Sequence, residues 1–232
     1  MPDRKPRQGL EVACELGFRP VAHLVARALS PLRVPPPAVV LAGTATGVAA
    51  AVAIGRHSFL LAALLLQLKT VLDNADGQLA RMTGRVTSFG RYLDSESDLV
   101  VDAAIFAALG LWIGAPLALL GFVLLTGVLS INFNLERRYR RAPADVGDSS
   151  MLSRLYRVLY GWQDGMFERV LPARPSRRAV GVVANFGLST QLLALGVCLA
   201  VGHPTAYVAV LCACALSLVP LLSPERRIEL AT

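Results

Sequence analysis

The chain has 232 residues, of which 54% are hydrophobic and 17% charged, and its formal net charge is +7. This composition excludes an ordinary soluble domain and favours an integral membrane protein, whose Ala, Leu, Val and Gly let helices pack closely in lipid. The basic residues cluster between apolar runs, so we interpret the charge as a topology signal and expect no nucleic-acid partner.

The first predicted element is an amphipathic helix at residues 10–29. Every fourth position of this segment is polar: Glu11, Glu15, Arg19, His23 and Arg27. One polar stripe on an otherwise apolar helix is typical of a segment that lies in the membrane interface. No apolar stretch typical of a signal peptide follows the basic start, so no cleaved leader is predicted.

Six apolar segments follow, each long enough to cross a bilayer as a helix. The expected spans are about 36–55, 58–83, 88–112, 116–136, 179–201 and 205–222. We expect one membrane domain over 1–232, made of an interfacial part at 1–33, a six-helix bundle at 34–223 and a tail at 224–232. The predicted fold class is therefore all-α and integral to the membrane, with six transmembrane helices preceded by an N-terminal amphipathic interfacial helix.

The distribution of Lys and Arg predicts the orientation of these spans. The turns near 56, 114 and 203 would share one side of the membrane, and they hold a single arginine, Arg56. The termini and the polar stretch 137–178 would lie on the other side, and they hold 18 basic residues. Because positive charge stays on the cytoplasmic side, both termini and the acidic site described next are predicted to be cytoplasmic.

Five aspartates lie within the second and third expected spans, where an uncompensated carboxylate is costly. On a helix, Asp73 and Asp76 share one face, and Asp94, Asp98 and Asp102 recur every four residues on the next. The short connection between the two spans makes their helices antiparallel neighbours. The carboxylates are therefore expected to converge near the cytoplasmic end of the pair.

Converging carboxylates indicate a bound cation, because mutual repulsion would otherwise oppose their ionisation. Oxygen ligands without Cys or His favour Mg²⁺ or Mn²⁺, with Ca²⁺ as a further hard cation, over zinc, copper or haem. Two ions that share carboxylates recur in phosphoryl chemistry, so we expect a pair. Gly77 and Gly90 leave room on the acidic faces for a ligand or for close helix packing, and Arg81 can donate to a phosphate.

The acidic stretch reads D-x2-D-G-x2-A-R-x8-G-x3-D-x3-D over 26 residues. Its fixed places are filled by Asp73, Asp76, Gly77, Ala80, Arg81, Gly90, Asp94 and Asp98. This pattern resembles the signature of the CDP-alcohol phosphotransferase family, also called CDP-alcohol phosphatidyltransferases, whose members have an amphipathic N-terminal helix and six transmembrane helices. The chain departs from many members of the family at residues 34–40. Those members resemble "TPN" followed by Thr or Ser at this place, whereas this chain has "VPPPAVV". We therefore expect no polar contact from this position.

The resemblance implies an enzyme of phospholipid biosynthesis that forms a homodimer. Its reaction would transfer a phospho-alcohol group, usually from CDP-diacylglycerol, to the hydroxyl of an acceptor alcohol, with release of CMP. The implied metal ligands are Asp73, Asp76, Asp94 and Asp98. The residues that would border the CDP group are Asp73, Gly77, Ala80, Arg81 and Gly90. Asp98 would also act as the general base on the acceptor hydroxyl.

The acceptor is left open by the sequence. Four arginines end the fourth span at the level of the acids: Arg137, Arg138, Arg140 and Arg141. They can bind the phosphate of an acceptor such as glycerol phosphate or inositol phosphate, or they can set topology and contact anionic lipid. Lys69 can pair with the acids, Asp102 has a structural or a functional role, and Glu96 points away from the acidic face.

Three alternatives to this reaction remain at this point. A soluble CDP-polyol could replace the lipid donor. A membrane prenyltransferase also binds diphosphate through Asp and Mg²⁺, but resembles a longer bundle with two separated Asp motifs. A cation transporter would explain the carboxylates but gives no role to Gly77, Ala80, Arg81 and Gly90.

Overall fold

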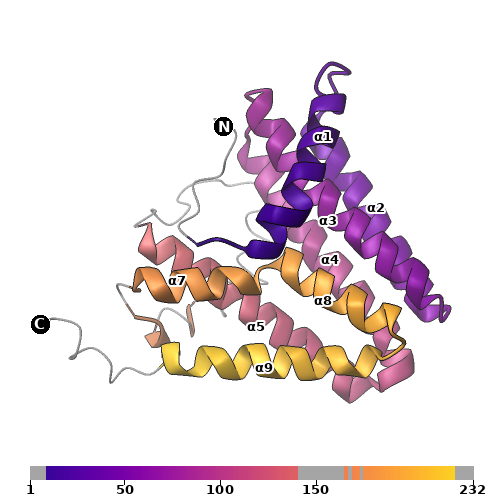
Figure 1. Ribbon diagram of the computed structural model, residues 1–232, viewed down its shortest axis with the longest axis vertical. Helices are drawn as coiled ribbons and strands as arrows, with labels where there is room; N and C mark the ends of the chain where they lie inside the picture. The colour runs from indigo at the N-terminus through magenta and orange to yellow at the C-terminus, as the bar shows by residue number, and fades with distance from the viewer. Residues whose placement is uncertain (1–8, 141–164, 167–168, 173–174, 223–232) are drawn as a thin grey trace, which may run out of the picture.

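The structure is a computed structural model that describes residues 9–140, 165–166, 169–172 and 175–222. Every regular element in these residues is helical (Figure 1). The helices are α1 (Arg19–Leu29), α2 (Pro36–Gly55), α3 (Phe59–Met82), α4 (Ser88–Ile113), α5 (Ala115–Tyr139), α7 (Arg177–Val183), α8 (Leu188–Ala200) and α9 (Pro204–Leu222). A π-helical turn, η1 (Cys14–Phe18), precedes α1, and a 3₁₀ turn, η2 (Ala184–Phe186), follows α7. The all-α class is confirmed.

The first four expected spans and the sixth appear as helices whose ends lie within three residues of the predicted ones. Pro36 occupies the first turn of α2, where a missing N–H breaks no helical hydrogen bond. Thr87 caps the N-terminus of α4, and its hydroxyl accepts a hydrogen bond from the N–H of Gly90 at 3.0 Å. Gly114 caps the C-terminus of α4 with a φ of 85°, which favours glycine.

The fifth expected span, 179–201, is not one straight helix. The segment from α7 through η2 ends at Phe186, and α8 begins at Leu188 after a bend of 40°. Between them Gly187 has φ −66° and ψ 165°, an extended conformation that interrupts the helical hydrogen bonds. The prediction of a single helix is wrong here, because the sequence is apolar on both sides of the break and gives no sign of it.

Several predictions fall on residues outside the described part of the chain. They concern the first eight residues of the interfacial part, most of the polar stretch 137–178, Arg141 and the tail 224–232.

Among the described helices, α2 and α5 are long and apolar enough to cross a membrane by themselves, and the bent pair α7–α8 would be a third span. The helices α3 and α4 are also long, but both carry the predicted acidic residues, while the apolar part of α9 is shorter. The chain is therefore a helical membrane protein with two or three candidate spans by composition, and the six-span arrangement stays a prediction.

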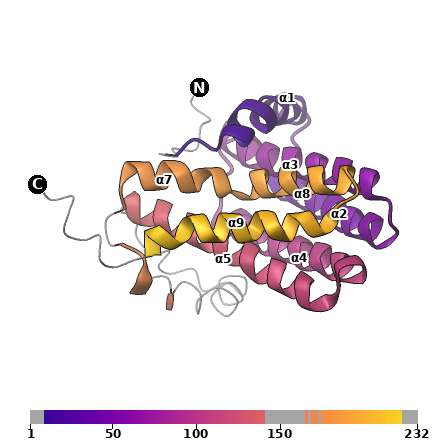
Figure 2. The same ribbon diagram turned by 60° about the horizontal axis from the view of Figure 1, so that its bottom comes forward.

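An apolar core fills the bundle beyond the acidic residues. The helix α2 packs against α3 and α4, α3 also contacts α8, and α5 contacts α4 and α9. Figure 2 shows α8 and α9 side by side along the bundle. Leu66, Ile105, Leu109 and Tyr207 are buried in this core. Because these residues come from the other halves of α3 and α4 and from α9, the core fixes the two helices that carry the acids.

The N-terminal segment lies across α3 with Phe18, Ala22 and Ala26 buried against the bundle and His23 at the edge of this contact. His23 Nδ1 is 3.1 Å from Gln78 Oε1, and the Gln78 amide donates to the backbone carbonyl of Arg19 at 3.3 Å. Leu16 and Leu24 point outward and are 75% and 66% exposed. Part of the predicted polar stripe therefore contacts the bundle, whereas Arg27 is exposed together with Leu16 and Leu24. Figure 1 shows α1 beside α3.

Candidate active site

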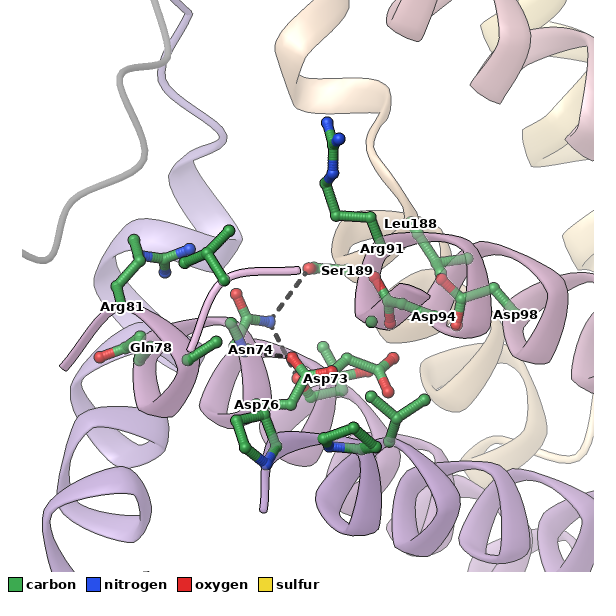
Figure 3. Close-up of a pocket in the computed structure, with 18 of the residues that line it drawn as sticks. Asp73, Asn74, Asp76, Gln78, Arg81, Arg91, Asp94, Asp98, Leu188 and Ser189 are labelled. Carbon is green, nitrogen blue, oxygen red and sulfur yellow. Dashed lines mark hydrogen bonds between the residues drawn. The ribbon is translucent and has the colours of Figure 1, made fainter. Parts of the chain in front are cut away.

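All eight residues of the acidic pattern line one cavity of about 490 Å³ at the end of α3 and the start of α4. They are Asp73, Asp76, Gly77, Ala80, Arg81, Gly90, Asp94 and Asp98. Figure 3 shows carboxylates from the two helices turned toward the same space, with Arg81 and Gln78 at one end. The predicted convergence of the two acidic faces is thus seen in the structure.

Three of the carboxylates come close enough to share a ligand. Ligand oxygens of Asp73, Asp94 and Asp98 all lie within 4.8 Å of one another, and Asp76 is buried in the wall of the same cavity. Each donor is a hard carboxylate oxygen, and these are the donors that Mg²⁺ and Mn²⁺ prefer. The residues present therefore fit a divalent cation.

Lys69 lies one helical turn before Asp73, and its side chain is only 1% exposed. Its ammonium group forms ion pairs with both Asp73 and Asp98, and so it joins α3 to α4 beneath the cavity. One lysine offsets one negative charge, whereas four aspartates line the space. The remaining negative charge is a further reason to expect a cation there.

Two glycines, Gly43 and Gly77, allow close contacts at the cavity. A Cβ atom added at Gly43 of α2 would lie 2.9 Å from Asp73 Oδ1, so α2 runs directly beside this carboxylate. A Cβ at Gly77 would lie 3.3 Å from the Arg81 guanidinium, which folds back over that position. The role of Gly77 in leaving room for a ligand stays a prediction, and Gly43 was not predicted. Its four-residue spacing from Gly47, typical of close helix packing, is the signal that could have found it.

The cavity also has polar lining that sequence reasoning missed. Arg85 and Arg91 come from the α3–α4 connection and the start of α4, and Asn74 comes from the acidic turn of α3. The Asn74 amide donates to Ser189 Oγ at 3.5 Å (Figure 3). Cys14 donates to Asn74 Oδ1 at 3.1 Å. Ser189 and Cys14 belong to segments far away in the sequence, so no local pattern places them here.

The arginines predicted to bind an acceptor lie elsewhere in the described part of the chain. Arg138 donates to the backbone carbonyls of Leu171 and Pro172 at 2.8 and 3.2 Å, and Arg140 pairs with Glu136. Together with Arg137 they are not among the cavity lining. Arg141 lies outside the described residues.

The two remaining acids of α4 are buried but do not line the cavity. Asp102 is 4% exposed and continues the face of Asp98 into the core, and Glu96 is 8% exposed. The Glu96 Oε1 atom has no hydrogen-bond partner among the described residues. The prediction that Glu96 lies apart from the acidic face agrees with this placement.

These features define a helical membrane protein with a carboxylate cavity that fits a divalent cation, and the comparison with protein families gives its class. The model of the CDP-alcohol phosphatidyltransferase family matches residues 34–219, so the chain belongs to this family. The predicted family and enzyme class are confirmed. The family depends on divalent metal, as predicted, and Asp73, Asp94 and Asp98 form a group that could hold it. Membership favours the transferase over a prenyltransferase or a cation transporter.

Individual relatives carry more specific names. The phosphatidylinositol phosphate synthase of Corynebacterium glutamicum is 32% identical over 162 residues, which are 67% of this chain and 68% of that protein. The phosphatidylinositol phosphate synthase of Streptomyces avermitilis is 37% identical over 92 residues, 39% of this chain. The match spans only 36% of the length of that second relative.

One solved structure is also similar to the chain. It is the phosphatidylinositol phosphate synthase of Mycobacterium tuberculosis with CDP-diacylglycerol bound, at 22% identity and a TM-score of 0.45. The alignment covers 85% of this chain and 92% of that one.

Proposed function

We propose that this protein transfers a phosphatidyl group from CDP-diacylglycerol to the hydroxyl of an alcohol or polyol phosphate and releases CMP. The convergence of Asp73, Asp76, Asp94 and Asp98 on one cavity is the observation that carries the proposal. Membership in the CDP-alcohol phosphatidyltransferase family supports the reaction class.

The four aspartates would hold two divalent ions, Mg²⁺ or Mn²⁺. When bound, such ions neutralise the diphosphate of the donor and stabilise the negative charge on the leaving CMP. Gly77, Ala80 and Gly90 leave space for the CDP group, with Asp73 beside it, and Arg81 donates to its phosphate oxygens.

Asp98 accepts the proton of the acceptor hydroxyl as the hydroxyl oxygen attacks phosphorus. The new oxygen–phosphorus bond forms while the bond to the CMP oxygen breaks, and the proton stays on the Asp98 carboxylate until it passes to solvent. Lys69 holds Asp98 and Asp73 in their orientations through its two ion pairs. The residues of the chain thus position the reactants and take up the proton.

We propose the chemical class of the acceptor, which is an alcohol that carries a phosphate. The names of the relatives support inositol phosphate as the first compound to test. Two sets of arginines can recognise the acceptor phosphate. One is the predicted set of Arg137, Arg138, Arg140 and Arg141, and the other is the pair Arg85 and Arg91 in the cavity lining.

The arrangement in the membrane follows from the predicted topology. Six spans, with η1 and α1 in the interface, place the cavity at the cytoplasmic end of α3 and α4, where a CTP-derived donor is available. The strong excess of Lys and Arg on that side supports this orientation. The exposed apolar side chains of the N-terminal segment support its interfacial position, and a homodimer is proposed from the family resemblance.

Purified protein in lipid would be incubated with CDP-diacylglycerol, Mg²⁺ or Mn²⁺ and a panel of alcohols: inositol, inositol phosphate and glycerol phosphate. We expect CMP release that needs both the metal and one of the phosphorylated alcohols. A soluble CDP-polyol is included as a rival donor. CMP release that survives a chelator, or release from the soluble donor only, contradicts the proposed reaction.

A further inference from the structure

A buried carboxylate from the N-terminal segment lies against the break between α7 and α8. Glu11 is only 2% exposed, and its Oε1 accepts hydrogen bonds from both the backbone N–H and the hydroxyl of Thr190, each at 3.0 Å. The two residues are 179 positions apart in the chain. A side chain of this polarity stays buried only when it is hydrogen-bonded, so the contact is specific.

The contact replaces a missing helix cap. Gly187 precedes the first residue of α8 and has no side chain to accept from the free N–H groups of the first turn. Thr190 is the third residue of α8, the position whose N–H a capping side chain normally binds. Glu11 fills this role from a distant segment, and its negative charge is favourable at a helix N-terminus.

Gly187 is required by this arrangement. A Cβ atom there would lie 2.7 Å from both carboxylate oxygens of Glu11, well inside normal contact distance. The backbone of Gly187, with φ −66° and ψ 165°, suits any residue, so the nearest obstacle to a side chain there is the Glu11 carboxylate, which would have to move. The carboxylate and the glycine therefore form a matched pair.

Neighbouring contacts bind the same segment to the same break. The N–H of Val12 donates to Asn185 Oδ1 at 3.0 Å. Gly9 is buried, and a Cβ atom there would lie 2.7 Å from the carbonyl oxygen of Val180 and would collide with Ala184. The contacts reach from α7 through η2 to α8, so the N-terminal segment fixes the bend.

The start of α8 is also a wall of the candidate active site. Leu188, Ser189 and Leu192 line the cavity with the acids, and Ser189 is joined to Asn74 and through it to Cys14. Thr190 lies within this stretch. A shift of the first turn of α8 would therefore change the shape of the cavity without touching an aspartate.

We propose that Glu11 is a positioning residue: by binding Thr190 it holds the first turn of α8 as the wall against which the acceptor alcohol binds. This inference rests on the proposed function for its substrate. We assign this wall to the acceptor because Figure 3 shows Leu188 and Ser189 at the end of the pocket that holds Asp94 and Asp98. Arg81, which is proposed to bind the donor, lies with Gln78 at the other end.

The test is a double-mutant cycle with Glu11→Ala and Gly187→Ala in the full chain. Each single variant breaks the Thr190 contact, the first by removing the carboxylate and the second by displacing it. The double variant has no carboxylate for the new methyl group to meet. The two changes should therefore not add: each lowers Tm by about 4–8 °C, and the double variant lies within about 1 °C of the worse single one.

Kinetics separate a positioning role from a purely structural one. We expect each single variant to raise KM for the panel alcohol that supports the fastest CMP release about fivefold or more, with KM for CDP-diacylglycerol changed less than about twofold. Glu11→Gln keeps the size and the acceptor oxygen and should give an intermediate KM; it also serves if Glu11→Ala does not fold. Unchanged acceptor KM despite a lower Tm, or additive effects, would overturn the proposal.

The reactivity of Cys14 tests the Glu11 contact without any enzyme assay, and so independently of the proposed reaction. Cys14 is 3% exposed, so it should react slowly with N-ethylmaleimide in the wild type. In Glu11→Ala and Gly187→Ala the reaction of Cys14 should be about tenfold faster. Mass spectrometry measures this rate, with Cys212 as the internal reference. If the wild type releases no CMP, the proposed reaction fails and the Tm cycle and the labelling rates decide the Glu11 contact. Equal labelling of Cys14 in all variants refutes it.

Discussion

The two halves of α3 and α4 contrast sharply although they belong to the same helices. Leu66, Ile105 and Leu109 lie in an apolar core, whereas Asp73 and Asp98 lie at the cavity. The core half has interdigitated side chains and is expected to determine stability. The acidic half concentrates like charges, which favour binding at the expense of stability. A helix pair can therefore hold a costly site rigidly because its other half is packed.

The helix α2 touches both regions through glycines one turn apart. A Cβ atom at Gly43 would meet Asp73, and one at Gly47 would lie 2.5 and 2.8 Å from the two methyl carbons of Val101. The contrast can thus be tested by variants that change one half and spare the other.

The largest effect is expected for Asp98→Asn. The amide keeps the shape of the carboxylate but cannot accept the acceptor proton, so kcat for CMP release should fall about 10³-fold. Tm should change little, because relief of repulsion among the carboxylates is offset by the loss of the negative charge that Asp98 pairs with Lys69. Near-normal turnover of Asp98→Asn would remove the general base from the mechanism.

Lys69→Met should lower kcat about tenfold to a hundredfold, because Asp73 and Asp98 lose the partner that orients them. Binding of Mn²⁺, followed by electron paramagnetic resonance, should become tighter, because a positive charge beside the ions is removed. If Lys69→Met binds Mn²⁺ more weakly, the lysine is needed to build the site and the interpretation is wrong.

Gly43→Ala and Gly47→Ala should separate the two halves. At Gly43 the flexible Asp73 carboxylate must move, so activity should fall about fivefold while Tm is kept. At Gly47 the branched Val101 cannot yield easily, so the free energy of unfolding should fall by about 1–3 kcal/mol while kcat is kept.

Gly127→Ala is the matched control for this pair. It lies within α5, and a Cβ atom there meets nothing within 4 Å among the described residues. The substitution should therefore leave kcat unchanged and stabilise the helix by up to about 1 kcal/mol. Equal loss of activity in all three glycine variants would show that the two halves of the helices do not act separately.

The smallest effect is expected for Arg138→Gln, because Arg138 donates to the backbone carbonyls of Leu171 and Pro172. Its KM for the acceptor should change less than about twofold, whereas Arg91→Gln, in the cavity lining, should raise it about tenfold. The reverse order would assign the acceptor phosphate to the arginines at the end of α5.

The sequence predicted what depends on local pattern. Apolar runs located α2 to α5 and α9, and the four-residue spacing of Asp94 and Asp98 placed them on one face. The bend at Gly187 was not predicted, because its contacts with Glu11 join residues 179 positions apart and form only in the folded chain. Ser189 was missed for the same reason, since α8 meets α3 through tertiary packing.

Metal binding tests the central claim most directly, without any assumption about substrate. Titration of the wild type with Mn²⁺ should show two ions bound per chain, and Asp94→Asn should lose at least one of them. A wild type that binds no Mn²⁺, or an Asp94→Asn variant that binds it as well as the wild type does, would contradict the assignment of these carboxylates as metal ligands.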